Sequence, residues 1–127
     1  MPKQALAKET LHTLLDHSYH AQILLSQEDW SEQDATHISF DQVVFQQMQM
    51  SKTHFKHVQI LDCQLHICDL ANAEWAETSL VRVELIGCHL TGWQCGEAQF
   101  QDALFKECSG SFASFALSKF QTVRFES

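Results

Sequence analysis

A large apolar residue at every fifth position, from residue 40 almost to the end, restricts the possible folds of this 127-residue sequence more than any other feature. A second series, of mostly smaller residues, stands two positions before each large one. The large series is Phe40, Phe45, Met50, Phe55, Ile60, Leu65, Leu70, Trp75, Leu80, Leu85, Leu90, Cys95, Phe100, Phe105, Gly110, Phe115, Phe120 and Phe125, and only Cys95 and Gly110 are small. A helix repeats every 3.6 residues and a strand every two, so a period of five fits neither a single amphipathic helix nor one long strand.

A chain that turns one corner every five residues explains both series. If four such units close a square, each residue stacks on the residue 20 positions later at the sheet spacing of about 4.8 Å. The large residue and the smaller one two positions earlier then both point inward. The other three positions point outward and are mostly polar, as at Lys56 and His57. Residues 38–127 therefore predict about four and a half coils of twenty residues.

The pattern resembles the pentapeptide-repeat protein family, whose unit is a small residue, then Asp or Asn, then Leu or Phe, then two variable residues. The clearest unit is Cys68-Asp69-Leu70-Ala71-Asn72. The Asp or Asn before the large residue occurs only at Asp69, which departs from the family pattern. The resemblance covers residues 38–127 and implies an all-β fold, a right-handed quadrilateral β-helix.

The start of the chain lacks the full pattern and predicts a short helix. Pro2 is favoured in the first turn of a helix, and Ala7, Leu11, Leu14 and Leu15 fall on one face at helical spacing. The first coil of a solenoid exposes an apolar end and unpaired strand edges, which an amphipathic segment can cover. We therefore expect an α-helical cap over about residues 3 to 16.

Residues 18–37 carry the inward pattern only in part. Trp30 and Ala35 are in phase with the later large residues, but Glu28 and Gln33 stand where small inward residues belong. We expect a partial, irregular coil here. The predicted division is an N-terminal helix and capping segment over residues 1–37 and a repeat solenoid over residues 38–127.

Composition restricts the partners and the compartment. Eight basic against sixteen acidic residues give a net charge of -8, which opposes direct binding to nucleic acid or to an anionic membrane surface. No apolar run approaches the roughly 20 residues of a membrane span, and the first residues do not resemble a secretory signal. The odd number of cysteines, five, fits a reducing environment. We therefore predict a cytoplasmic protein.

The cysteines do not predict a disulfide or a zinc site. Cys68, Cys88 and Cys108 lie 20 residues apart and should stack in one inward column. Parallel side chains about 4.8 Å apart lie outside the Cβ separation of a disulfide. A closed zinc site also lacks a fourth ligand, because the histidines of the repeat face outward. We interpret these thiols as small core residues.

The histidines predict no catalytic or metal site either. His37 and His57 should stack on one outer corner that continues into Glu77 and Glu97, with a weak pair between His57 and Glu77. We interpret this column as solvated neighbours rather than as metal ligands. No nucleophile stands with a base and an orienting group. We predict no catalytic residue, no metal and no cofactor.

Four aliphatic residues at outward positions predict a binding surface. An apolar patch with a charged rim is typical of a protein contact site, although single exposed aliphatics are normal. The predicted protein-binding patch consists of Leu61, Ile67, Val81 and Ile86, with the charged residues Asp62, Arg82 and Glu84.

The C-terminal coil is rich in aromatic residues that nothing later in the sequence covers. They are Phe112, Phe115, Phe120 and Phe125. An apolar end with unpaired strand edges favours a partner, and a two-fold contact between identical ends is the commonest solution. The resemblance implies the same, because relatives often dimerise through their carboxyl ends. We predict a tail-to-tail homodimer through these four residues; the alternative is that Phe112 or Phe125 folds over its own column.

Two classes of function remain open. A filled column without a cleft favours a rigid, non-enzymatic scaffold or adaptor that binds a protein through its outer faces. The resemblance implies a second class, because some relatives are acidic mimics of duplex DNA that bind or protect a type II topoisomerase such as DNA gyrase. Residues 38–127 hold ten acidic and six basic residues, net -4, whereas a rod about 22 Å tall with the charge density of DNA needs about thirteen negative charges. We therefore rank DNA mimicry second.

Overall fold

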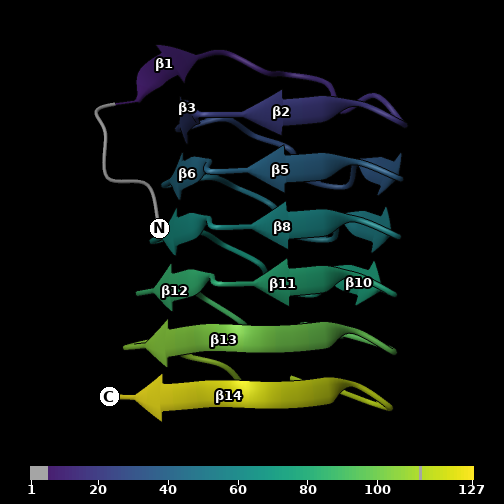
Figure 1. Cartoon of the computed structure of the whole chain (residues 1–127), viewed down its shortest axis with the longest axis vertical. Coiled ribbons are helices and arrows are strands. Elements are labelled where there is room, and N and C mark those ends of the chain that lie inside the picture. Colours follow the sequence, from purple (N-terminus) through teal and green to yellow (C-terminus); the bar gives the residue numbers. More distant parts are fainter. Residues whose placement is uncertain (1–5, 112) are drawn as a thin grey trace.

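Stacked strands form the regular structure of residues 6–111 and 113–127, which the computed structural model describes (Figure 1). Together they build a β-solenoid of about six turns. The strands are β1 (Ala7–Glu9), β2 (Tyr19–Ala21), β3 (Ile23–Ser26), β4 (Asp34–Thr36), β5 (Ser39–Asp41), β6 (Val44–Gln46), β7 (His54–Lys56), β8 (Gln59–Leu61), β9 (Gln64–His66), β10 (Glu74–Ala76), β11 (Ser79–Val81), β12 (Glu84–Ile86), β13 (Gln99–Lys106) and β14 (Lys119–Glu126). The predicted all-β solenoid is confirmed.

Parallel pairing between successive coils forms the faces of the column. Strands β2, β5, β8 and β11 build one face, and β3, β6, β9 and β12 build the next. The longer β13 and β14 continue both, which joins them into one 11-stranded sheet that also includes β1. Strands β4, β7 and β10 form a third face, and isolated bridges such as Gln49 to Asp69 link the coils on the fourth. The register pairs residues 20 apart, as Leu65 with Leu85, so the predicted stacking is confirmed.

A residue with a left-handed backbone marks each corner. Positive φ angles recur every five residues from His17 (63°) to Thr122 (56°), at every position of that series that the structure describes. Only Gly87 and Gly92 among them are glycines, and a left-handed backbone costs other residues about 1–2 kcal/mol each. Hydrogen bonds between coils offset this cost, as where the Asp62 N–H donates to the Val81 carbonyl at 2.9 Å.

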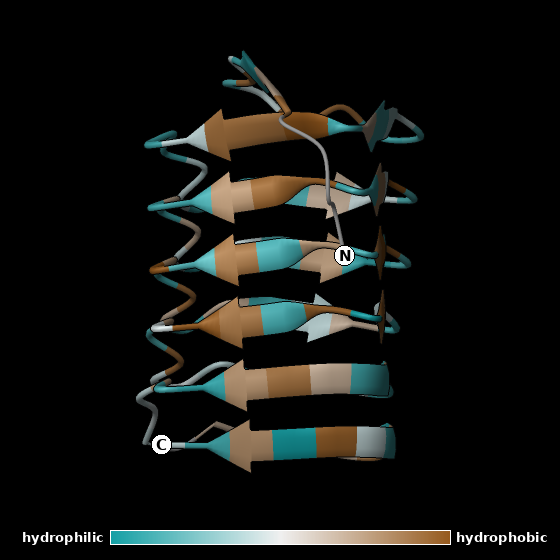
Figure 2. Ribbon diagram, turned by 60° about the vertical axis from the view of Figure 1, so that its left-hand side comes forward, coloured by the Kyte–Doolittle hydropathy of each residue, from teal (hydrophilic) through white to brown (hydrophobic). Residues whose placement is uncertain are grey.

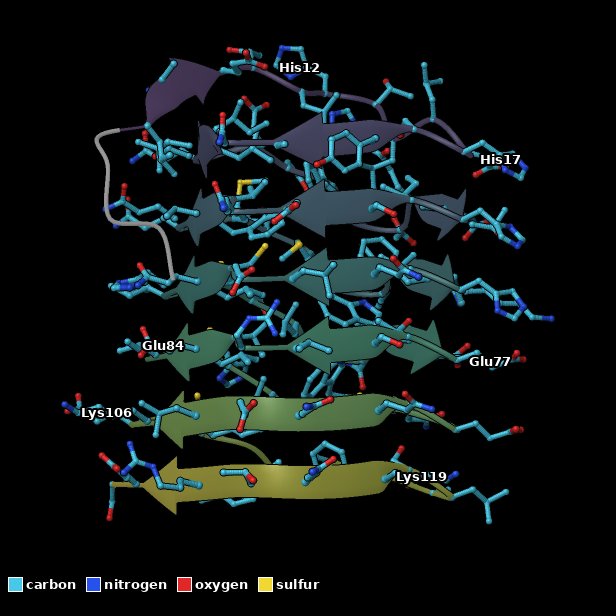
Figure 3. The ribbon with its side chains drawn as sticks, viewed as in Figure 1. His12, His17, Glu77, Glu84, Lys106 and Lys119 are labelled. Atoms are coloured by element: carbon cyan, nitrogen blue, oxygen red, sulfur yellow. The ribbon has the colours of Figure 1, made fainter. Side chains whose placement is uncertain are left out.

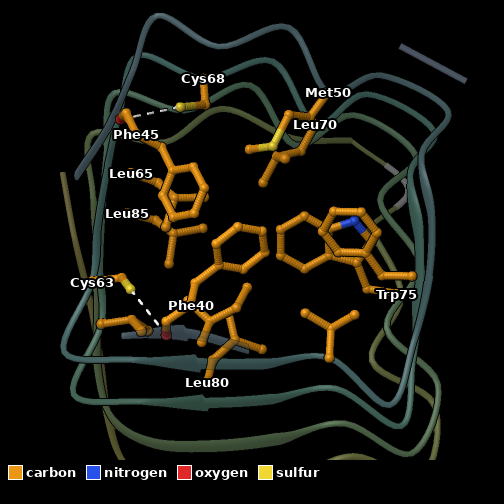
Figure 4. Close-up of a cluster of buried hydrophobic side chains, with 14 of the residues drawn as sticks. Phe40, Phe45, Met50, Cys63, Leu65, Cys68, Leu70, Trp75, Leu80 and Leu85 are labelled. Carbon is orange, nitrogen blue, oxygen red and sulfur yellow. Dashed lines mark hydrogen bonds between the residues drawn. The ribbon is translucent and has the colours of Figure 1, made fainter. Parts of the chain in front are cut away.

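The large residues of the repeat fill the interior. Leu65, Leu70, Leu80 and Leu85 are each 0% exposed, and Figure 4 shows them pointing inward from different sides of the column. Hydrophobic and hydrophilic residues are mixed along the strands of the stack (Figure 2). This mixture is what one-sided burial of a strand requires, because successive side chains point to opposite faces.

Trp93 and Cys95 exchange their sizes within the core. Trp93 occupies a slot that holds a small residue in other coils, and Cys95 occupies a large slot; they are 0% and 1% exposed. The Trp93 ring meets the Trp75 ring edge-on, with 5.4 Å between centroids. The exchange keeps the interior filled, as close packing requires.

The predicted N-terminal helix is wrong, because no residue from 6 to 16 is helical. The segment is extended instead, and β1 pairs with β3 in parallel, with Ala7 opposite Ile23. A helix would satisfy its own backbone and leave the edge of β3 unpaired, whereas an extended chain supplies the missing partners. Leu14 is buried and Leu11 is partly buried against the core. We call residues 6–16 the N-terminal strap.

Regular winding also begins earlier than we expected. The corner at His17 starts the uninterrupted series, so residues 18–37 form a regular coil. The polar residues in its small slots hold the N-terminal strap. Gln33 accepts a hydrogen bond from the Leu14 N–H at 2.9 Å and donates one to the His12 carbonyl at 2.7 Å, and the buried Glu28 carboxylate lies 2.9 Å from His12 Nδ1. These inward positions hold polar side chains because polar groups of the N-terminal strap lie against them: backbone groups at Gln33 and the His12 imidazole at Glu28.

Candidate functional site

The five cysteines lie in the core or at its edge. All five are free, and Cys68 and Cys88 are buried while Cys108 is partly buried. The Cys88 thiol donates a hydrogen bond to the Leu65 carbonyl at 3.2 Å. Burial raises the pKa of the Cys63 thiol to about 12. A thiol with such a pKa is protonated at neutral pH and is therefore a poor nucleophile.

Within residues 6–111 and 113–127, no group of three or more His, Cys, Asp or Glu side chains could hold a metal ion. The same part of the chain contains no helix that is long and apolar enough to cross a membrane.

The predicted protein-binding patch divides into two pairs of aliphatic residues. Leu61 and Val81 lie opposite each other on β8 and β11, just before a corner, and both are partly buried. Ile67, 61% exposed, follows β9 at the next corner, where its N–H bonds the Ile86 carbonyl at 2.9 Å. The face of β9 and β12 lies between the two pairs.

Charged and polar side chains separate these two pairs. On the face between them, Gln64 donates a hydrogen bond to the Glu84 carboxylate at 3.1 Å. At the corner beside Leu61, the Arg82 guanidinium contacts both carboxylate oxygens of Asp62, at 2.5 and 3.1 Å. These hydrogen bonds lower the pKa of Asp62. The surface is a polar strip with an aliphatic pair on each side.

Aromatic side chains at the C-terminal end of the column are exposed or partly buried. Phe120 is 44% exposed and Phe125 is 61% exposed, while Phe115 is partly buried. Each rests on the coil before it: the Phe125 ring stacks on Phe105 with 4.8 Å between centroids. The fourth predicted contact residue, Phe112, lies outside the described residues. Along β14, the last strand in Figure 1, one side pairs with β13 and no described strand pairs with the other.

An apolar cavity of about 330 Å³ opens at this end. Leu90, Phe105, Phe115 and Phe125 contribute to its lining. Gly110, which occupies a large inward slot without a side chain, also lines it. A Cβ at Gly110 would lie 2.9 Å from Leu90 Cβ, so the backbone of Gly110 is too close to the previous coil for a side chain.

One outer corner carries a column of three histidines. The predicted stack of His37 on His57 is present, with 4.9 Å between ring centroids. His17 extends it, with 4.9 Å to the His37 ring and 10° between the ring planes. His57 Nε2 lies 3.3 Å from a Glu77 carboxylate oxygen, and Figure 3 labels His17 and Glu77 at this corner. Sequence reasoning missed His17 because the regular series was taken to start at Ile38, although the 20-residue spacing reaches it.

Comparisons with known proteins agree with this architecture. No protein-family model matches the chain, and no curated protein sequence matches it. Among solved structures, a pentapeptide-repeat protein (Rfr23) from the cyanobacterium Cyanothece 51142 superposes with a TM-score of 0.69 at 13% identity, over 88% of this chain and 86% of that one. The chain has the pentapeptide-repeat fold.

A second pentapeptide-repeat solenoid is more distant. QnrB1, a plasmid-mediated fluoroquinolone resistance protein, gives a TM-score of 0.48 at 10% identity, over 91% of this chain and 90% of that one. At these identities the likeness concerns the fold alone. The function of this pentapeptide-repeat solenoid must therefore be argued from its own surface.

Proposed function

We propose that this chain is a rigid, non-enzymatic scaffold or adaptor that binds a protein partner through its outer faces. The observation that carries the proposal is the exposure of aliphatic side chains on a stiff surface, above all Ile67 at 61%. Each coil is bonded to the next through its backbone, so these side chains keep their relative positions without a partner. A preformed surface loses little conformational entropy on binding, which favours affinity.

The pair Leu61 and Val81 provides the sharpest test. The double variant Leu61→Glu/Val81→Glu places charge on an aliphatic pair at the rim of the polar strip, and should abolish capture of the partner from extracts of the source cell. The matched control is Gln59→Glu/Ser79→Glu, which changes the facing pair two residues earlier on the same strands. Both variants should keep a cooperative thermal transition. Equal capture by the two folded variants contradicts the assignment of this surface.

We also propose that the C-terminal end forms a homodimer through Phe115, Phe120 and Phe125, with Phe112 as a further contact. The apolar cavity and the unpaired side of β14 support this contact, since both would be covered by a second copy. Light scattering over a concentration series should show the mass rising above the 14.5 kDa of one chain.

A variant at the exposed ring tests the dimer contact directly. Phe120→Ser removes a ring whose burial contributes roughly 1.5–3 kcal/mol, so it should raise the dissociation constant about tenfold or more. Gln121→Ser is the matched control on the same strand. A mass fixed at 14.5 kDa up to high micromolar concentration contradicts the dimer.

The net charge of -8 favours one alternative function, an acidic mimic of duplex DNA that occupies a type II topoisomerase. A supercoiling assay with DNA gyrase distinguishes it from the adaptor. Inhibition or protection of the enzyme at stoichiometric concentration would support mimicry, and unchanged supercoiling would contradict it.

A further inference from the structure

The histidine column is held in place by the backbone at its corner. His17, His37 and His57 all have left-handed backbones, at φ 63°, 58° and 55°. Their N–H groups donate to the carbonyls of Thr36, Lys56 and Ala76 at 3.1, 3.1 and 3.2 Å. The fold therefore repeats one imidazole position three times, with 4.9 Å between successive ring centroids. All three histidines are exposed.

A hydroxyl group contacts the central imidazole. His37 Nδ1 lies 2.8 Å from Thr36 Oγ1. When Nδ1 carries the proton and donates it to that oxygen, Nε2 holds the lone pair. Metal-bound histidines are usually oriented in this way, by a hydrogen bond from the ring nitrogen that does not bind the metal. In that tautomer His37 Nε2 can bind a metal ion, and an imidazole lies on each side of the ring.

We propose that His17, His37 and His57 form an open site for a divalent transition-metal ion that prefers imidazole, such as Ni²⁺, Zn²⁺ or Cu²⁺. His37 and one neighbour bind the ion, and water fills the remaining positions. Metal–nitrogen bonds are about 2.0–2.1 Å long, so the two nitrogens must lie within about 4.2 Å. The rings stack at 10° and 26°, so two exposed imidazoles must rotate about their side-chain bonds for their nitrogens to converge on one ion. A two-imidazole site does not need the closed group of three ligands that the described residues lack.

The surroundings of the column favour a cation at its lower end. The Glu77 carboxylate lies 3.3 Å from His57 Nε2, and Glu97 continues the same corner in the next coil. Lys56, which precedes His57, is the nearest basic residue in the sequence and opposes the ion. Because imidazole suits Ni²⁺, Zn²⁺ and Cu²⁺, whereas Mg²⁺ and Ca²⁺ take oxygen ligands, the site should discriminate between the two groups.

Calorimetric titration of the full chain without a histidine tag tests the site, with Ni²⁺ and Zn²⁺ as probes and Mg²⁺ as the negative probe. The wild-type protein should bind about one Ni²⁺ per chain. His37→Gln should weaken Ni²⁺ binding about tenfold or more, because both imidazole pairs share His37 and even a supporting group is worth about 10- to 100-fold in affinity. Glutamine is well suited to this position, since Gln22, Gln27, Gln42 and Gln47 occupy equivalent corners.

Matched variants separate the column from the other histidines. His89→Gln is the control, because His89 is exposed and contacts the hydroxyls of Ser109 and Thr91 without a stacked imidazole; it should bind Ni²⁺ as the wild type does. His17→Gln/His57→Gln removes both neighbours and should weaken binding as strongly as His37→Gln. Wild-type affinity in folded His37→Gln, a comparable heat with Mg²⁺, or no heat with Ni²⁺ and Zn²⁺ overturns the proposal.

Discussion

The indole Nε1 of Trp30 donates a hydrogen bond of 2.6 Å to the backbone carbonyl of Leu11. Trp30 belongs to the first regular coil and Leu11 to the N-terminal strap, so this bond ties the strap across the top of the core. Gln33 and Glu28 hold neighbouring strap residues in the same way. Glu28 and Gln33 do not fit the inward pattern of the sequence, and they are the residues that bind the strap over the end of the core.

Gln33→Ala should loosen the N-terminal strap. The substitution removes hydrogen bonds to Leu14 and His12, each worth about 0.5–1.5 kcal/mol. Hydrogen exchange followed by mass spectrometry should show faster exchange in β1, while β8 and β11 stay protected. Gln42→Ala, which alters an exposed corner elsewhere, is the control. Unchanged exchange in β1 would show that the strap is held by other contacts.

Leu85→Ala should destabilise the column by about 2–5 kcal/mol, because the neighbouring coils cannot close around the cavity it leaves. Leu85 is 0% exposed and pairs in register with both Leu65 and Phe105. Urea denaturation measures the loss. Leu104→Ala, at a partly exposed position of β13, is the matched control and should cost clearly less. A loss at Leu85 below about half a kcal/mol is incompatible with its burial.

Gly92→Ala and Gly96→Ala should differ although they lie four residues apart. Gly92 has a φ of +68°, and a Cβ there would lie 2.3 Å from Asn72 Oδ1. The left-handed backbone alone should cost alanine about 1–2 kcal/mol. Gly96 has no such φ and no atom within 4 Å of an added Cβ, so its substitution should be neutral within about 0.5 kcal/mol. Thermal unfolding of the two variants gives the comparison, and equal losses would contradict it.

The contact between Arg82 and Asp62 should shift the titration midpoint of the Asp62 carboxyl to lower pH. Arg82 hydrogen bonds lower the pKa of Asp62 in the folded protein below its value in the unfolded chain. The pair therefore contributes stability above the ordinary Asp value of about 3.9, and this contribution is lost as the pH falls through the folded-state pKa. In an NMR titration, the midpoint of the Asp62 carboxyl should lie at higher pH in Arg82→Gln than in the wild-type protein. An identical midpoint in both proteins would show that Arg82 does not set it.

The sequence by itself determined the repeating part of this protein. Each coil packs mainly on the coils before and after it, so a local period of five is enough to specify which residues point inward and which residues stack. The corner of His37 and His57 and the exchange of Trp93 with Cys95 could be predicted for that reason. Both follow from the five-residue unit, which sets the inward positions, and from the stacking of residues 20 positions apart.

Only the tertiary structure determined the conformation of the chain at the two ends of the repeat. Residues 6–16 have helical spacing, yet the unpaired edge of β3 makes an extended strap the better partner. Glu28 and Gln33 do not fit the inward pattern of the sequence, and only the structure shows that they bind groups of the N-terminal strap. At the other end, Gly110 lies so close to Leu90 that a side chain does not fit at its inward position, and a cavity opens beside it. The ends depend on contacts with no periodic counterpart, so their conformation cannot be read from the repeat.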